Sequence, residues 1–434
     1  MSTRLLRLGI LGASDAVPTT YLPVLHTLQK QYHLTIIYDP NSHHAEACKA
    51  KFNIAQTTTD IQEVLHHPDV DLILNLLPTE YHEKYTVAAL EAGKHVMVEV
   101  PLCMSIHGLR RIRDAIKKGQ AVRTHGEGDG DGGNVGKPKI FMGCVRRYAP
   151  VVEDVFKKEL ASLGRVYYAR CRNIAGPMNI VASVLNGTSD TNGNNGTDET
   201  STHSTAEFHS TLSEMFGLPE DLTPDRVAFC RWLGTLGCHD LSLMRETLGF
   251  PNAVSSVSIT DPFYSAIFHY TDTRHDGHPF TLLYEAGVDT VPRCDAHLTV
   301  YGERRSVSLQ YDFPCPGESI GQGRAVRVVV EESVDGDGDE AVNGNGNGCA
   351  NVTGAGVSNG STSTGAARPR VKRTETVSSC EEAYASEFTA LHAYLVDDVP
   401  AKTSADDALL DLRMLYMIFD HYDRQCGTIR TPLG

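Results

Sequence analysis

The segment that decides the fold reads GILGASDAV, residues 9–17. It continues the apolar run Leu5–Leu11, which predicts a buried strand, and it leads into residues 17–30, where leucines recur at three-residue steps as in a helix. A glycine turn between a buried strand and a helix is typical of a dinucleotide-binding unit, because the turn lets the backbone approach a pyrophosphate. Gly12 alone satisfies the pattern Gly-x-Gly-x-x-Gly, since serine and valine stand at the other two glycine positions.

The residue that ends the second predicted strand strengthens this interpretation. Asp39 follows the run Leu34–Tyr38, and a carboxylate there accepts hydrogen bonds from both ribose hydroxyls and repels a 2′-phosphate. We therefore expect Gly12, Ala13 and Ser14 to line the pyrophosphate and Asp39 to favour NAD, with NADP as the alternative cofactor. The other interpretation of Asp39 is that it opens a turn before the next helix.

Strands and helices continue to alternate up to about residue 120. The predicted strands are Leu5–Leu11, Leu34–Tyr38, Asp71–Leu77 and His95–Glu99, and the predicted helices cover residues 17–30, 41–52, 79–92 and 105–118. Strands that are apolar throughout and separated by helices indicate a parallel sheet covered on both faces. We predict an α/β protein whose residues 1–123 form a doubly wound Rossmann domain.

The rest of the chain has a different pattern of residues. Runs rich in β-branched and aromatic residues predict strands at Gly164–Asn173, Ala253–Ile259, Phe280–Ala286, Ala296–Tyr301, Ser306–Tyr311 and Ala325–Val330, and two helices close the chain at Glu381–Val396 and Ser404–Tyr422. We predict that residues 139–434 form an α+β domain with a large, mostly antiparallel sheet. Residues 124–138, 186–206 and 332–368 contain few apolar side chains, so we expect disordered surface insertions there.

Composition excludes several classes of function. The 434 residues carry 54 acidic and 39 basic side chains, a net charge of −15, which disfavours binding to nucleic acid. We find no apolar run near the ~20 residues that span a bilayer and no signal peptide. Eleven scattered cysteines without zinc spacing indicate reduced thiols and no metal site. We expect a cytoplasmic protein that does not bind a membrane.

Four further segments carry candidate chemistry: LLPTEYH at 76–82, GKHVMVEVP at 93–101, FMGCVRRYAP at 141–150 and LGTLGCHDLSLMRE at 233–246. Together with the turn at Gly12 they resemble the glucose–fructose oxidoreductase / inositol dehydrogenase (Gfo/Idh/MocA) family. That family carries Glu-Lys-Pro where this chain has Glu99, Val100 and Pro101. Its lysine acts as an acid/base or orients the substrate, which an aliphatic side chain cannot do.

The resemblance implies roles for particular residues on the cofactor side. Pro78 and His82 are expected beside the adenosine and pyrophosphate, although His82 can equally be a histidine on a helix surface. Glu99 and Val100 are expected near the nicotinamide. Arg147 is expected at the cofactor or substrate, whereas its neighbour Arg146 is expected in a structural ion pair.

On the substrate side, His239 is expected to be the general acid/base, Asp240 its charge partner and Tyr148 a residue that orients the substrate oxygen. We place His239 at a helix N-terminus, whose positive end would keep the imidazole neutral. A purely structural histidine remains the alternative, and Asp240 can instead complement the helix dipole. Thr235 stands where many members of the family have an aspartate.

Two functions follow from the resemblance. The first is an NAD(P)-dependent oxidoreductase that moves a hydride between nicotinamide and a secondary alcohol or ketone of a sugar-like or secondary-metabolite substrate. The second is a catalytically silent, NAD(P)-sensing regulator of the same fold. The family also implies a homodimer formed through the antiparallel sheet.

Overall fold

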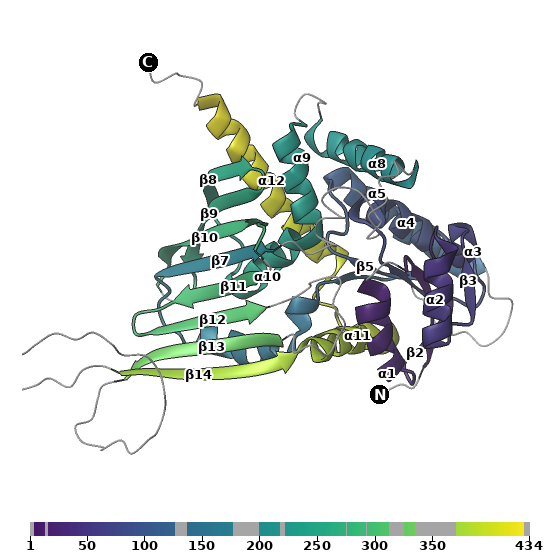
Figure 1. Cartoon of the computed structure of the whole chain (residues 1–434), viewed down its shortest axis with the longest axis horizontal. Coiled ribbons are helices and arrows are strands. Elements are labelled where there is room, and N and C mark those ends of the chain that lie inside the picture. Colours follow the sequence, from purple (N-terminus) through teal and green to yellow (C-terminus); the bar gives the residue numbers. More distant parts are fainter. Residues whose placement is uncertain are drawn as a thin grey trace, which may run out of the picture.

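The structure, a computed structural model, describes residues 4–13, 16–125, 137–176, 199–217, 222–274, 276–291, 293–311, 325–334 and 370–428. Ser14 and most of the three predicted insertions lie outside these residues. Two β-sheets stand side by side, and helices from the end of the chain pass between them (Figure 1).

The first sheet is the predicted parallel one. Its strand order is β3-β2-β1-β4-β5-β6, and every neighbouring pair is parallel. The strands are β1 (Leu6–Leu11), β2 (Tyr32–Tyr38), β3 (Gln56–Thr58), β4 (Leu72–Asn75), β5 (His95–Glu99) and β6 (Ile140–Gly143). The helical segments of this part are η1 (Val17–Tyr21), α1 (Leu22–Thr27), α2 (Ser42–Phe52), α3 (Ile61–Leu65), α4 (Thr79–Glu91) and α5 (Ile106–His125). This order is that of a dinucleotide-binding Rossmann sheet, which confirms the predicted fold class.

Some elements of the first half differ from the prediction. The short β3 and α3 were not predicted, and the predicted helix over residues 17–30 is a π-helical turn followed by the short α1. The edge strand β6 follows residue 123, so the parallel sheet extends past the predicted end of the first domain.

The second sheet has eight strands in the order β14-β13-β12-β11-β7-β10-β9-β8. Strands β7 and β10 are parallel and the other neighbouring pairs antiparallel, as predicted for a mostly antiparallel sheet. The strands are β7 (Tyr168–Ala175), β8 (Ala253–Thr260), β9 (Phe263–Asp272), β10 (His278–Val288), β11 (Cys294–Tyr301), β12 (Arg305–Tyr311), β13 (Ala325–Val334) and β14 (Arg370–Ser379). Strands β9 and β14 were not predicted, and β13 extends into the third predicted insertion, at residues 332–334.

Helices cover one face of this sheet. They include α9 (Pro224–Trp232) and α12 (Ala405–Thr428) against β8, and α10 (Cys238–Leu248) against β7. A further helix, α8 (Glu199–Phe216), packs on α4, so residues 199–206 of the second predicted insertion are helical. In the part of the chain that the structure describes, no helix has both the length and the apolar character needed to cross a bilayer.

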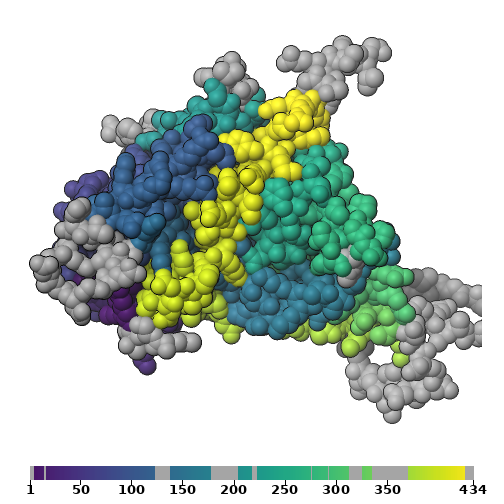
Figure 2. All heavy atoms as spheres, turned by 180° about the vertical axis from the view of Figure 1, so that it is seen from behind, coloured from purple at the N-terminus to yellow at the C-terminus, as the bar shows by residue number. Residues whose placement is uncertain are grey.

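The C-terminal helices fill the seam between the two halves (Figure 2). Helix α11 (Cys380–Val396) packs on the Rossmann part, where the Tyr32 hydroxyl donates to the carbonyl oxygen of Phe388 at 2.6 Å. At the start of the α12 segment, the Met142 amide donates to the carbonyl oxygen of Thr403 at 2.9 Å. The last 60 residues therefore bring side chains to the end of the parallel sheet at which β5 and β6 stop.

Candidate active site

The turn after β1 requires glycine at its first position. Gly12 has a φ of +99°, and a Cβ atom there would lie 3.1 Å from the carbonyl oxygen of Leu76. Its amide donates to the carbonyl oxygen of Tyr38 at 2.9 Å, which ties the turn to the end of β2. The backbone of the turn therefore lies against the loops that follow β2 and β4, as a site for a pyrophosphate requires.

Asp39 joins the two loops at this end of the sheet. Its carboxylate accepts hydrogen bonds from the amide of Ala13 at 2.7 Å and from the amide of Asn41 at 2.9 Å. The side chain is buried, and His44 Nδ1 lies 3.4 Å from one of its oxygens. The contact with Asn41 is the turn that the alternative interpretation predicted. A carboxylate offers about four lone-pair sites, so a ribose hydroxyl can still be accepted.

The loop between β4 and α4 is held by a buried histidine. Pro78 is exposed at the start of α4, whereas His82 is 2% exposed and not on a helix surface. Its ring nitrogens lie 2.8 Å from the carbonyl oxygens of Leu77 and Pro101. Because both nitrogens are engaged, the predicted contact of His82 with the cofactor is corrected: the ring instead connects the loops after β4 and β5.

The end of β5 is held from three sides. The Tyr21 hydroxyl donates to Glu99 Oε1 at 2.5 Å, and the Val100 amide donates to the carbonyl oxygen of Gly143 at 3.2 Å. The third contact is the one between Pro101 and His82. Burial raises the pKa of Glu99 above its usual value, against the opposing effect of the Tyr21 hydrogen bond.

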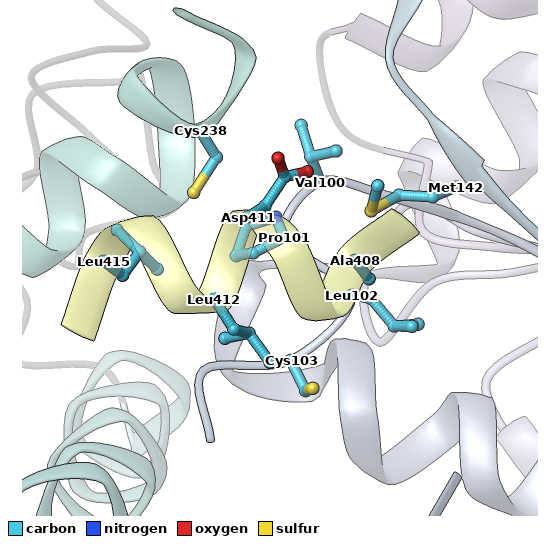
Figure 3. Close-up of a pocket in the computed structure, with 10 residues that line it drawn as sticks. All are labelled: Val100, Pro101, Leu102, Cys103, Met142, Cys238, Ala408, Asp411, Leu412 and Leu415. Carbon is cyan, nitrogen blue, oxygen red and sulfur yellow. The ribbon is translucent and has the colours of Figure 1, made fainter. Parts of the chain in front are cut away.

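Val100 faces the C-terminal helix (Figure 3). Its side chain is 3% exposed and lines a cavity of roughly 10 Å³, about the space of one water molecule. The other lining residues are Pro101, Leu102, Cys103, Met142, Cys238, Ala408, Asp411, Leu412 and Leu415. Val100 therefore packs into the core instead of forming the wall of an open substrate pocket.

His239 lies inside a continuous helical segment. Helix α9 runs through the π-helical turn η5 (Leu233–Gly237) directly into α10, and Gly237 itself has helical backbone angles. No helix N-terminus exists at His239, which corrects the predicted cause of its neutrality. Burial, with a smaller contribution from the Arg146 guanidinium, lowers the pKa of His239 well below its usual 6.5. The imidazole is 4% exposed, and its Nδ1 atom is buried without a hydrogen-bond partner among the described residues.

Two contacts place this helical segment beside the Rossmann loops. The Thr79 hydroxyl, at the start of α4, donates to the carbonyl oxygen of Gly234 at 2.9 Å. Cys238, which precedes His239, lines the same small cavity as Val100. Turns of π-helix are frequent at functional sites. The turn η5 contains Gly234, and His239 follows Gly234 by little more than one helical turn.

Asp240 points away from this position, into the core. Its carboxylate is fully buried and accepts hydrogen bonds from Arg146, from Asn173 Nδ2 at 2.8 Å and from the Tyr311 hydroxyl at 2.9 Å. Against the effect of burial, Asp240 raises the pKa of Arg146, whose guanidinium also lies 4.0 Å from the centre of the Tyr311 ring. Asp240 is thus the ion-pair partner of Arg146, as expected for that arginine, and not the predicted partner of His239.

Arg147 belongs to a buried ionic network between the helices. The guanidinium contacts Glu246 and Asp407, and it donates to Ser242 Oγ at 2.9 Å and to the carbonyl oxygen of Lys402 at 3.1 Å. Every nitrogen of the guanidinium has a protein partner, so the structure gives Arg147 a connecting role and not the predicted contact with cofactor or substrate.

Tyr148 is also engaged elsewhere. Its hydroxyl lies 2.7 Å from Thr403 Oγ1, and its ring is buried beside Phe141. Burial raises the pKa of Tyr148 well above its usual 10. A phenol held in this way does not orient a substrate oxygen, which corrects the role predicted for it.

The structure therefore brings Gly12, Ala13, Asp39, Pro78 and Glu99 to one end of the parallel sheet, with His239 on the helix packed against it. Sequence reasoning missed three residues around this end: Tyr21, Glu387 and Asp411. Glu387 and Asp411 lie more than 240 residues from the strands they approach, and no local motif marks them.

These residues fit a bound dinucleotide. A glycine without room for a Cβ atom stands where the backbone must approach a pyrophosphate, and Asp39 lies beside it. The buried Nδ1 atom of His239, which has no partner among the described residues, is an atom that a bound ligand could satisfy.

Comparison with known proteins agrees with the Rossmann fold of the first part of the chain. Residues 6–126 match the Gfo/Idh/MocA family model, described as an oxidoreductase family with an NAD-binding Rossmann fold. The chain is 32% identical over 163 residues to inositol 2-dehydrogenase of Klebsiella pneumoniae (strain 342), a match that covers 34% of this chain and 48% of that protein. The chain thus spans about half the length of the curated relatives it matches.

Solved structures are similar over nearly the whole chain. Levoglucosan dehydrogenase, in complex with NADH and levoglucosan, is 14% identical with a TM-score of 0.63, and the match covers 97% of this chain and 98% of that one. A 3-ketoreductase from Actinomadura kijaniata, in complex with NADP and TDP-benzene, is 13% identical with a TM-score of 0.59, covering 94% and 95%. These likenesses establish the two-part fold. Residues 6–126 are thus the part of the chain that is similar to the Gfo/Idh/MocA family.

Proposed function

We propose that this protein is an NAD-dependent oxidoreductase that moves a hydride between nicotinamide and a secondary alcohol or ketone, with His239 as its proton carrier. The observation that carries the proposal is the state of His239: buried, neutral and with an unpartnered Nδ1 atom, on a helix packed against the cofactor loops. The substrate class is a sugar-like compound or a secondary metabolite.

The bound cofactor would accept or give the hydride, and a side chain of the protein must accept or donate the accompanying proton. A neutral imidazole can accept the proton of a substrate hydroxyl as the carbonyl forms, and the lowered pKa of His239 keeps the ring in this neutral form. Burial keeps the ring neutral, with a smaller contribution from Arg146, and Asp240 holds Arg146 in place. With Val100 buried and Asp240 and Tyr148 engaged elsewhere, His239 acts without the second acid/base group that a lysine would provide.

The cofactor would be held by Gly12, Ala13 and Asp39, with the Pro78 loop and Glu99 nearby. Asp39 supports NAD over NADP, because its buried carboxylate would repel a 2′-phosphate at the adenosine ribose. Two members of the fold bind different cofactors, NADH and NADP, so the preference has to be measured on this chain.

The decisive experiment combines binding and turnover. Isothermal titration calorimetry with NADH and NADPH should give tighter binding of NADH, and Asp39→Ala should reduce the difference. Wild-type protein with NAD is then assayed against polyols, lactones, sugars and apolar secondary alcohols by absorbance of NADH. Absence of any nucleotide binding would refute the proposal.

A second function has an observation in its favour. Val100 replaces the lysine of the family, and its buried side chain lines only a small cavity beside helix α12. A protein that only senses NAD would keep the nucleotide loops and lose its acid/base groups. NADH binding by the wild type without turnover of any substrate would favour this regulator.

We also propose a homodimer formed through the uncovered face of the eight-stranded sheet. Half-exposed positions on that face carry the ion pairs Arg170–Glu285 and Arg172–Asp295. Light scattering coupled to size-exclusion chromatography tests this assembly. A charged interface predicts that the dimer weakens as the salt concentration rises, and a monomer at all salt concentrations would refute it.

A further inference from the structure

Two glutamates, the half-buried Glu99 and the buried Glu387, approach each other at the end of β6. Glu99 ends β5 and pairs in register with Gly143, and a Cβ atom on Gly143 would lie 2.5 Å from Glu99 Oε1. The next amide, that of Cys144, donates to Glu387 Oε1 at 2.6 Å. The carboxyl groups of Glu99 and Glu387 therefore occupy adjacent positions around one peptide unit, although 288 residues separate them in the chain.

Among the described residues, the cation that acts on Glu387, Lys402, is bonded to other groups. Glu387 is fully buried, and its Oε2 atom has no hydrogen-bond partner among the described residues. The titratable groups around the pair are Tyr21, Tyr32, Tyr148, Tyr384, Cys144 and Lys402. Of these only Lys402 is cationic, and its ammonium contacts Glu153 and the carbonyl oxygen of Arg147.

Ionisation of both glutamates is therefore unfavourable. A buried carboxylate oxygen without a hydrogen-bond donor costs several kcal/mol, and a second negative charge nearby adds to that cost. Burial, and then the charge of Glu99, raises the pKa of Glu387 well above its usual value. The Tyr21 hydroxyl stabilises the charge on Glu99, so the proton belongs mainly to Glu387.

We propose that Glu99 and Glu387 share one proton at neutral pH, and that this pair locks the end of β5 onto helix α11. Glu387 is a positioning residue, because it acts through Glu99 and not on a reacting atom. The functional consequence rests on the proposed function: Glu99 precedes the residue that replaces the lysine, so loss of the proton disturbs the strand end expected beside nicotinamide.

Infrared difference spectroscopy on the whole chain tests the pair directly. The wild type should show the carbonyl stretch of a protonated carboxylic acid at neutral pH. Glu387→Gln should lose that band, whereas Glu99→Gln, which removes the neighbouring carboxylate, should shift it. Glu381→Gln, on the same helix and partly exposed, is the matched control and should keep it. Absence of the band in the wild type, or its persistence in Glu387→Gln, would overturn the proposal.

A second measurement uses the pH dependence of folding. Because the pKa of Glu387 is raised, its contribution to stability is present at low pH and is lost as pH rises through the native pKa. Above the pKa that Glu387 has in the unfolded chain, the folding equilibrium constant of the wild type should therefore fall relative to that of Glu387→Gln. The expected fall is up to tenfold per pH unit. A constant ratio across that range would contradict a shared proton.

Titration of NADH separates this proposal from the proposed function. Affinity for NADH should weaken with rising pH in the wild type and stay flatter in Glu387→Gln. Should NADH fail to bind while the infrared band is present, the oxidoreductase is refuted and the carboxyl pair stands. NADH binding without the infrared band refutes the pair alone.

Discussion

The nucleotide end and the substrate end of this site are built from different kinds of contact. At the nucleotide end, backbone groups meet side chains that are close in sequence: Ala13 with Asp39 over 26 residues, and His82 with Leu77 over 5. At the substrate end, buried ion pairs join distant segments, such as Arg147 and Asp407 over 260 residues.

The contrast separates groups that can do chemistry from groups that hold the fold. Asp240, Arg147 and Tyr148 all carry suitable functional groups, yet each is engaged by partners from the core. His239 differs from them because its Nδ1 atom is buried and has no partner among the described residues. Substitutions in the two classes should therefore affect different measurements.

The largest expected effect is on catalysis at His239. His239→Gln should reduce turnover by about 10²- to 10⁴-fold, the usual contribution of one general acid/base group, and leave NADH affinity unchanged. Steady-state kinetics and calorimetry on the same preparation measure both quantities. The exposed His209 provides the control as His209→Gln. Equal turnover of the His239→Gln and His209→Gln variants would show that His239 has no catalytic role.

Asp240→Ala should instead act on stability. Removing one partner of a buried ion pair leaves the Arg146 charge uncompensated, which costs about 3–5 kcal/mol in the free energy of unfolding. Urea denaturation measures the loss, with the exposed Asp420→Ala as control, for which a change within about 0.5 kcal/mol is expected. A small loss of stability with a large loss of turnover would instead show that Asp240 acts in catalysis.

The pH dependence of unfolding sharpens the same comparison. Because the pKa of His239 is lowered, the unfolded chain binds a proton below about pH 6.5 that the native imidazole does not bind. Its contribution to stability therefore falls as pH falls, by up to about 1.4 kcal/mol per pH unit until the native ring is protonated. His239→Gln should remove this share of the slope in urea titrations. Parallel slopes for the two proteins would mean that the native imidazole titrates normally.

The smallest effect is expected for Tyr148. Tyr148→Phe removes the hydrogen bond with Thr403 and should cost about 1 kcal/mol of stability without changing turnover. A double-mutant cycle with Thr403→Val isolates the pair. A clear decrease in turnover would show that the hydroxyl reaches the substrate, contrary to the geometry.

Much of the first half of the site was predictable because its determinants are local. Alternating apolar strands and helices predict the parallel sheet, and the carboxyl ends of parallel strands necessarily lie at one edge. Gly12, Asp39 and Glu99 each end or follow a predicted strand, so their common location follows from periodicity alone. The short β3 escaped prediction because three half-exposed residues carry no clear pattern.

The substrate side shows why motifs are less informative there. The type of a side chain does not reveal whether buried residues already bind it. The partners of Arg147, Tyr148 and Asp240 come from distant strands and helices, and no local sequence pattern connects these elements. The error over the helix end at His239 has a similar origin. The helix end was expected from the family resemblance, but the π-helical turn LGTLG, with Leu233 and Leu236 buried, continues the helix through it.

The amino-acid sequence by itself determined the Rossmann sheet, the position of the cofactor turn and the absence of a lysine at residue 100, because these depend on local periodicity and on the identity of single residues. Tertiary structure alone decided which titratable groups stay available and which are buried in pairs, such as Arg146 with Asp240. That decision depends on burial and on charges brought together across hundreds of residues, and local sequence contains neither quantity.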